Sequence, residues 1–299
     1  MISKGTEGEK RFSYINTKRG ETAAPYDKLH VYLLNGVLPY SEERALGPWF
    51  VGNWVEENNS FLFFSKPSKD RVMAIVERRP GLEVLEEFAF DYDQWQGESL
   101  ESIKIAGFLI RPYWYREEKW KGPSEIQEIL LDPGVVFGNG LHPTTQDCLR
   151  ALRWLMGSKD ITNVLDLGTG TGILAIASAL MGAKEVLAVD INPLCVKTAE
   201  KNVRLNGVED IVRVIEGSAY DFSGVGADLI VANLDYDVIS ELLKEQKFIN
   251  KRWYIFSGLM RTPYRKLKVM VEKCGMRVEK EWDHEMTWFT IACKGRCKA

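Results

Sequence analysis

The sequence predicts an α/β protein in which a doubly wound sheet of seven strands follows a smaller α+β domain. Three observations support this prediction. A glycine-rich turn joins two short apolar runs, residues 164–167 and 185–189. After this turn, strand-like and helix-like segments alternate, which is typical of a mainly parallel sheet. Before it, residues 29–90 contain six short elements in the order β-α-β-β-α-β.

Composition restricts the class of protein. The 299 residues are 45% hydrophobic, so they can fill the cores of two domains. A net charge of −3 provides no overall basic field, and we expect no direct binding of nucleic acid. No apolar run approaches the roughly 18 to 20 residues of a membrane helix, and the N-terminus lacks a secretion signal. The five scattered cysteines indicate reduced thiols, a cytoplasmic location and no metal site.

We expect four regions: a flexible arm over residues 1–28, a domain over 29–91, a linker over 92–127 and a catalytic domain over 128–299. In the region over 29–91, the sequence predicts strands at 30–34, 49–56, 60–65 and 82–90 and helices at 39–46 and 68–78. We expect Ser68 to cap the helix over 68–78. This order is that of a ferredoxin-like fold. The region carries no cofactor motif, so we expect it to recognise a macromolecular substrate; the alternative is a stabilising cap.

The linker is rich in aromatic residues, which predict packing rather than ligand contacts. We expect one strand crossing between the domains and a loop over residues 117–124. A helix beginning at Pro143 follows, with Thr144 and Thr145 in its first turn. The glycines and polar residues that precede this helix can seat a carboxylate at its N-terminus.

The glycine turn contains Asp166, Gly168 and Gly170, and the acid Asp190 ends the next strand. Glycines let the backbone turn sharply and approach a ligand, and an acid at this position can accept hydrogen bonds from a ribose. The spacing departs from the dinucleotide fingerprint, because the third glycine comes one residue early and Ile173 stands where Gly or Ala is expected. The charge of Asp166 also opposes a phosphate but suits an amino group.

This pattern resembles motifs I and II of the class I S-adenosylmethionine (SAM) methyltransferases, whose catalytic domain is Rossmann-like. The resemblance implies SAM as cofactor and S-adenosylhomocysteine as product, with Asp166 at the methionine end and Asp190 at the ribose. The alternative is another Rossmann-like nucleotide binder, such as an NAD-dependent oxidoreductase.

A second stretch narrows the resemblance. Residues 132–145 read DPGVVFGNGLHPTT, residues 228–234 read DLIVANL, and Trp288 lies in the last predicted strand. Together with the glycine turn, these segments resemble the ribosomal protein L-eleven methyltransferase (PrmA) family. The resemblance is strong over residues 126–294 and weaker over 29–120, where it depends on the order of the elements.

The family resemblance implies a set of site residues. Thr145 and Gly168 line the cofactor, Asp190 binds the ribose, and Asp166 and Gly170 complete the loop. Cofactor contacts are also expected from two residues at the ends of later strands: Ser218 and Asn233. Ser218 lies near the adenine, although an ordinary loop serine remains the alternative there.

Asn233 is the expected catalytic residue, because its amide oxygen can accept from an amine N–H and leave the lone pair free. His142 is expected to be a hydrogen-bonded structural residue, and no general base is assigned. Asp235 or Tyr236 could help to remove the proton, as could solvent.

The implied activity is SAM-dependent N-methylation of lysine or N-terminal amines of a protein, with ribosomal protein L-eleven as the expected substrate. Asn139, Leu141 and the pair Asp235-Tyr236 depart from the family pattern close to the expected acceptor site. They motivate one alternative, a related methyltransferase for another protein lysine or a small molecule. A catalytically silent binding protein is a further alternative, disfavoured by the intact Asp190 and Asn233.

Overall fold

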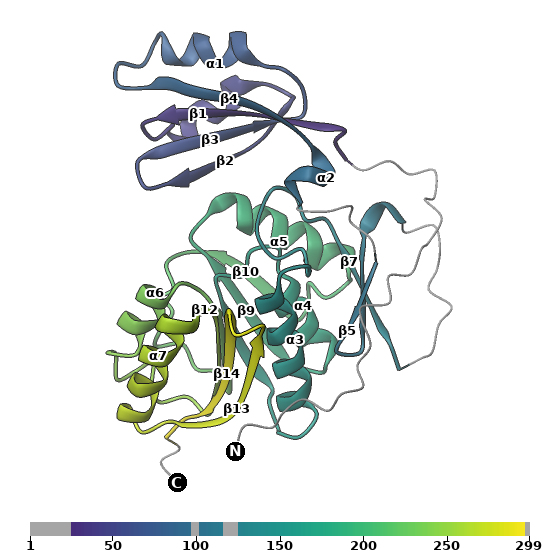
Figure 1. Cartoon of the computed structure of the whole chain (residues 1–299). Coiled ribbons are helices and arrows are strands. Elements are labelled where there is room, and N and C mark those ends of the chain that lie inside the picture. Colours follow the sequence, from purple (N-terminus) through teal and green to yellow (C-terminus); the bar gives the residue numbers. More distant parts are fainter. Residues whose placement is uncertain (1–24, 97–101, 116–124, 297–299) are drawn as a thin grey trace.

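The computed structural model describes residues 25–96, 102–115 and 125–296. A four-stranded sheet with its helices lies at one end, a seven-stranded sheet with five helices at the other, and a small three-stranded sheet at the side (Figure 1). Within the described ranges, no helix is long and apolar enough to cross a membrane.

The large sheet has the doubly wound arrangement that the sequence predicts. Its order is β10-β9-β8-β11-β12-β14-β13, and the neighbours are parallel except on both sides of β14. The strand order reverses between β8 and β11, where α/β proteins bind ligands at the carboxyl ends of the strands. The strands are β8 (Asn163–Leu167), β9 (Glu185–Asp190), β10 (Val212–Glu216), β11 (Leu229–Asn233), β12 (Trp253–Met260), β13 (Arg277–His284) and β14 (Trp288–Lys294).

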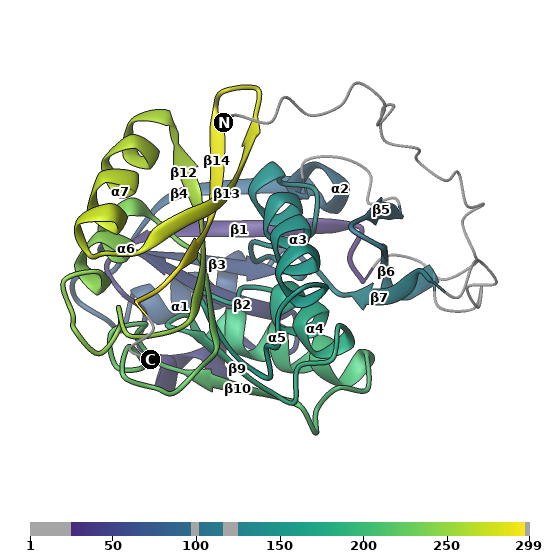
Figure 2. The same cartoon turned by 90° about the horizontal axis from the view of Figure 1, so that it is seen from below.

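Helices cover both faces of this sheet (Figure 2). One face packs on α3 (Pro143–Met156), α4 (Ile173–Leu180) and α5 (Pro193–Leu205), and the other on α6 (Tyr236–Leu242) and α7 (Arg261–Lys273). Successive strand residues alternate between the two cores: Val231 packs on the α3 side and Ala232 on the α6 side. By the same alternation, Asn233 faces the α3 side at the carboxyl end of β11.

The N-terminal sheet is antiparallel with the order β2-β3-β1-β4. Its elements are β1 (Lys28–Asn35), η1 (Tyr40–Leu46), β2 (Phe50–Glu56), β3 (Asn59–Phe64), α1 (Lys69–Val76) and β4 (Glu83–Asp91). This is the ferredoxin-like arrangement predicted from the order of the elements, except that the first helix is a short 3₁₀ helix. One face of the sheet packs on α1 through Leu34, Phe64, Val72 and Ile75.

Two local predictions for this region differ from the structure. Ser68 makes no capping bond; its hydroxyl donates to the carbonyl of Lys66 at 3.0 Å, and its N–H donates to Tyr32 Oη at 2.9 Å. The predicted arm also ends too late, because Tyr26 packs edge-on against Tyr92 with ring centroids 5.4 Å apart. Residues 1–24 of that arm lie outside the described residues.

The linker forms a three-stranded sheet rather than the single crossing strand predicted. It contains α2 (Tyr92–Trp95), β5 (Ile103–Ile105), β6 (Phe108–Pro112) and η2 (Tyr113–Tyr115), and β6 pairs in parallel with β7 (Gln127–Leu131). Arg111 on β6 is paired with Glu128 on β7, which helps to hold the two strands together. The pattern of apolar residues in a strand does not show which other strand it pairs with, so this parallel pairing could not be predicted from the sequence. The predicted loop over 117–124 lies outside the described residues.

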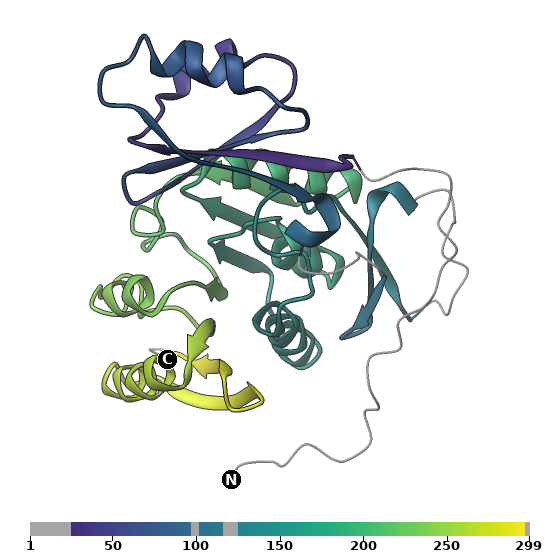
Figure 3. The same ribbon diagram turned by 45° about the horizontal axis from the view of Figure 1, so that its top comes forward.

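The N-terminal sheet lies across α5 of the catalytic part (Figure 3). A shared apolar cluster holds them together: Leu29, Val31 and Phe63 of the sheet, and Leu194 and Cys195 of α5, are among its buried members. A Cβ at Gly52 on β2 would lie 2.5 Å from Leu194 Cδ1, so a larger residue here would displace the Leu194 side chain. This packing places β2 and β3 next to the loops at the carboxyl edge of the large sheet.

Candidate active site

The glycine turn between β8 and α4 is as sharp as predicted. Gly168, Gly170 and Gly172 all have positive φ (73°, 55° and 83°), which favours glycine. A Cβ at Gly168 would lie 2.2 Å from Leu234 Cδ2, and one at Gly170 would lie 2.5 Å from the carbonyl oxygen of Phe137. The turn therefore packs tightly against the loops after β7 and β11.

The loop over residues 137–142 lies directly on this turn. Thr171 N donates to the carbonyl oxygen of Phe137 at 3.1 Å, and Thr171 Oγ1 donates to that of Gly138 at 2.7 Å. The two sequence motifs, which lie about thirty residues apart, thus form one continuous wall.

Asp190 lies at the end of β9, beside the glycine turn. Its Oδ2 accepts from Gly170 N at 2.9 Å and its Oδ1 from Asn192 N at 3.0 Å, while burial raises its pKa. Each carboxylate oxygen can accept more than one bond, so Asp190 retains capacity toward a ligand. Ser218 follows β10, whose last residue Glu216 pairs with Asp190, and so it reaches the same edge.

Ile191 is a residue that the sequence did not single out. Its side chain is 71% exposed, directly after Asp190 at the carboxyl edge. An exposed isoleucine directly after the acid that ends β9 suits the flat, apolar face of a ring. The exposure of Ile191 depends on how the neighbouring loops pack. It could therefore not be predicted from an apolar residue that follows a strand.

Asp166 and Thr145 each have a buried polar atom without a partner among the described residues. Asp166 is 1% exposed, and its Oδ2 accepts from Thr169 Oγ1 at 2.7 Å while its Oδ1 has no hydrogen bond. Burial, together with the charge of Asp190, raises the pKa of Asp166 to about 7. Thr145 is also 1% exposed, and its Oγ1 is unpaired.

The two groups lie on the same side of the sheet. Asp166 lies two residues after Val164 on β8, and Val164 packs on the α3 side of the sheet. Alternate residues of a strand share a face, so the Asp166 side chain also points to the α3 side. Burial raises the pKa of Cys148, which lies one turn beyond Thr145 on α3, and the charges of Asp147 and Asp166 add to this rise. Unpaired buried polar groups are costly unless something satisfies them. An acceptor and a hydroxyl here fit a ligand that carries both an amino group and a carboxylate, as the end of an amino acid does.

Asn233, at the end of β11, contacts the first turn of α3. Its Nδ2 donates to Thr144 Oγ1 at 3.4 Å. Among the described residues, no group donates a hydrogen bond to its Oδ1, which therefore remains available to a ligand. Ser257 on β12 also contacts this turn, because its Oγ donates to the carbonyl oxygen of Thr144 at 3.4 Å. Neither Thr144 nor Ser257 was predicted from the sequence to belong to the site.

His142 has the structural role expected for it. It caps α3, because its Nδ1 accepts from Thr144 N at 3.3 Å. This nitrogen therefore carries no proton, and the Thr144 hydroxyl donates to it at 2.7 Å. The ring packs against Phe137 and Trp288, with centroids 5.2 Å and 4.9 Å away. Burial, and then the charge of His284, lower its pKa, so the ring is neutral.

The departures from the family pattern make internal contacts or face solvent. Asn139 Nδ2 donates to the main-chain oxygen of Gln96 at 3.1 Å and to its Oε1 at 3.2 Å, which ties the loop to the linker. Tyr236 Oη donates to Met270 Sδ at 3.5 Å, away from Asn233. Asp235 is exposed at the start of α6. Within the described ranges, no group of acidic, histidine and cysteine side chains could hold a metal.

Comparison with known proteins agrees with this geometry. The family model described as ribosomal protein L11 methyltransferase (PrmA) matches residues 83–296. The ribosomal protein L11 methyltransferase of Aquifex aeolicus (strain VF5) is 36% identical over 209 residues, which cover 70% of this chain and 78% of that protein. The protein of the same description from Bacillus cereus (strain B4264) is 39% identical over 174 residues, which cover 58% of this chain but 54% of the relative.

A solved structure extends the similarity to three dimensions. The ribosomal protein L11 methylase from Lactobacillus delbrueckii subsp. bulgaricus superposes with a TM-score of 0.55 and 31% identity, covering 64% of this chain and 96% of that one. The family match includes all seven residues that the sequence analysis assigned to the site. The chain belongs to the ribosomal protein L11 methyltransferase (PrmA) family.

Proposed function

We propose that this protein transfers methyl groups from SAM to amino groups of a protein, on lysine side chains, the N-terminal amine or both, and that ribosomal protein L11 is the substrate. The family match over residues 83–296 is the observation that carries this proposal. The relatives named above are described as ribosomal protein L11 methyltransferases. A cytoplasmic location follows from the same proposal.

The methionine end of SAM fits the unpaired groups of Asp166 and Thr145. The carboxylate of Asp166 would accept from the amino group, and the hydroxyl of Thr145 would donate to the carboxylate. Both protein atoms are buried and otherwise unpaired among the described residues, which supports this assignment. The backbone at Gly168 and Gly170 would allow the close approach.

The nucleoside end of SAM fits the edge formed by β9 and β10. Asp190 would accept hydrogen bonds from the ribose hydroxyls. The exposed side chain of Ile191 would pack on the adenine, and Ser218 would lie beside it. When bound, SAM supplies an electrophilic methyl group on a sulfonium sulfur.

Asn233 would hold the acceptor amine. A lysine ammonium must lose a proton before its lone pair can attack, because it is mostly protonated at neutral pH. The free Oδ1 of Asn233 can then accept one N–H and direct the lone pair toward the methyl group. The proton would leave to solvent or to the exposed Asp235, since Tyr236 is engaged with Met270.

The N-terminal region over residues 29–91 would recognise the substrate. Its sheet packs beside the carboxyl edge of the catalytic sheet, where an acceptor must enter. The family match begins at residue 83 and leaves most of this region out. This observation supports a second candidate, a methyltransferase of the same family fold that acts on another protein lysine or on a small molecule.

A methylation assay separates these candidates. The purified full chain is incubated with SAM and unmethylated ribosomal protein L11, and in parallel with other lysine-rich proteins and small amines; intact mass is then measured. We expect mass increments of whole methyl groups on L11 alone. SAM binding with increments only on another acceptor would support the second candidate. Absence of SAM binding in calorimetry would refute both.

A further inference from the structure

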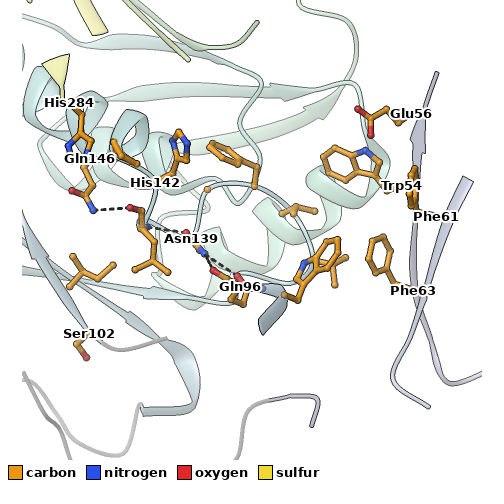
Figure 4. Close-up of a pocket in the computed structure, with 18 of the residues that line it drawn as sticks. Trp54, Glu56, Phe61, Phe63, Gln96, Ser102, Asn139, His142, Gln146 and His284 are labelled. Carbon is orange, nitrogen blue, oxygen red and sulfur yellow. Dashed lines mark hydrogen bonds between the residues drawn. The ribbon is translucent and has the colours of Figure 1, made fainter. Parts of the chain in front are cut away.

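A cavity of about 760 Å³ lies between the N-terminal sheet, the linker and the loop over residues 137–143 (Figure 4). Ligand sites in proteins have volumes of this order. None of the seven residues assigned to the cofactor or to catalysis lines it. The proposed cofactor site therefore does not account for this cavity.

The wall that the N-terminal part contributes is aromatic. Trp54 on β2 pairs directly with Phe61 on β3, and Phe63 lies two residues further along the same face. Trp95 of α2 packs edge-on against Phe63, with ring centroids 5.0 Å apart. Figure 4 shows Trp54, Phe61 and Phe63 together on this side, across the cavity from His142. A long apolar chain can therefore lie against rings over several ångströms.

A carboxylate stands at the end of this wall. Glu56 follows Trp54 by two residues on β2, so both point to the same face, and both line the cavity. Among the described residues, no cation pairs with Glu56. The other ionisable lining residues are Lys104 on β5, His142 and His284, and Figure 4 shows the two histidines across the cavity from Glu56. The aromatic end is therefore negatively charged.

The cavity is close to the proposed reaction centre. His142 lines it and accepts from the Thr144 hydroxyl, which in turn contacts Asn233. The aromatic wall itself comes from residues before position 83, outside the family match, except for Trp95. This wall is thus a candidate for selecting the acceptor of this particular chain.

We propose that the cavity binds a lysine side chain of the acceptor protein, one that neighbours the amine to be methylated. Its methylene groups pack on Trp54, Phe61 and Phe63, and its ammonium lies against the ring faces and the carboxylate of Glu56. The chain already contains such a contact, because Lys66 Nζ lies 3.8 Å from the ring centroid of Trp49. This inference depends on the proposed function, since it takes the acceptor to be a protein.

Binding of two small probes tests the cavity directly. The probes are N-acetyl-lysine methylamide and N-acetyl-norleucine methylamide, which has a similar chain without the ammonium. Each is titrated into the full chain while NMR records the indole N–H signal of Trp54, assigned with Trp54→Phe. We expect the lysine probe to shift this signal at lower concentration than the norleucine probe. Glu56→Gln should weaken the lysine probe about three-fold and leave the norleucine probe unchanged.

Glu57→Gln is the matched control, because Glu57 is exposed like its neighbour Glu56 but does not line the cavity. In methylation assays with L11, Glu56→Gln should raise KM for the acceptor about three-fold, while kcat and SAM affinity stay unchanged. Equal binding of both probes, or a lysine preference of unchanged size in Glu56→Gln, would overturn the inference. If the lysine probe binds more tightly than the norleucine probe but L11 is not methylated, the cavity still binds a lysine side chain and the proposed substrate is refuted instead.

Discussion

The hydroxyl oxygen of Thr144 accepts a hydrogen bond from the side-chain amide of Asn233, and the two atoms are 3.4 Å apart. The residues are 89 positions apart in the chain, one in the first turn of α3 and the other at the end of β11. Because the hydroxyl proton is given to His142, the oxygen can only accept from Asn233. The amide nitrogen of Asn233 is thereby held toward Thr144, and its oxygen is left for the acceptor amine.

Thr144 should therefore act as a positioning residue. Thr144→Val removes the hydroxyl and leaves the Asn233 amide free to rotate, so we expect kcat for L11 methylation to fall about tenfold. Thr144→Ser keeps the hydroxyl and should restore most of the rate. Steady-state kinetics and SAM calorimetry measure the two effects separately. Equal losses in the two variants, or a parallel loss of SAM affinity, would show a merely structural role.

Binding of SAM should depend on pH through Asp166. Without ligand its pKa is raised to about 7, whereas accepting from the amino group of SAM requires the carboxylate. Protonation thus competes with binding, and affinity should fall by up to about tenfold per pH unit below pH 7 and level off above it. Asp166→Asn should bind SAM more weakly with a flat profile. Calorimetry on both sides of pH 7 tests this, and a parent profile as flat as the variant's would refute it.

Asp190 should determine affinity for SAM but not the rate of transfer. Asp190→Asn removes the charge that would bind the ribose hydroxyls, and we expect the Kd for SAM to rise about tenfold. The rate at saturating SAM should change little. Asp237→Asn is the control, since Asp237 is exposed on α6. An unchanged Kd in Asp190→Asn would remove this residue from the cofactor site.

The contact between Asn139 and Gln96 should stabilise the fold. Asn139→Thr removes both hydrogen bonds to Gln96, so the free energy of unfolding should fall by about 1–2 kcal/mol. Gln96→Ala should have a similar effect, and the double variant should lose less than the sum. Denaturant unfolding measures all three. Additive losses would mean that the two side chains act independently.

The sequence predicted the elements that local pattern determines. The glycine turn, Asp166 and Asp190 belong to one β-α-β unit, and the seven strands and their doubly wound arrangement follow from alternating segments. The ferredoxin-like sheet was also predicted from the order of its elements, although each is short. In these cases apolar periodicity and turn residues carry the information.

Contacts between distant segments were not predictable in the same way. The sequence placed Asn233 at a strand end, but not its bond to Thr144. It also missed the parallel pairing of β6 with β7, because strand patterns do not identify the partner. The exposed side chain of Ile191 and the aromatic cavity wall depend on how the loops and the N-terminal sheet pack, which requires the assembled fold.

The most direct test of the account compares the parent protein with Asn233→Ala. Both are incubated with SAM and unmethylated ribosomal protein L11, and intact mass is recorded over time beside calorimetry of SAM binding. We expect methyl increments with the parent, a rate reduced about 100-fold or more in the variant, and nearly equal SAM affinities. Methylation of L11 by the variant at the parent rate, or a loss of SAM binding as large as the loss of rate, would contradict the role of Asn233 as the residue that orients the acceptor amine.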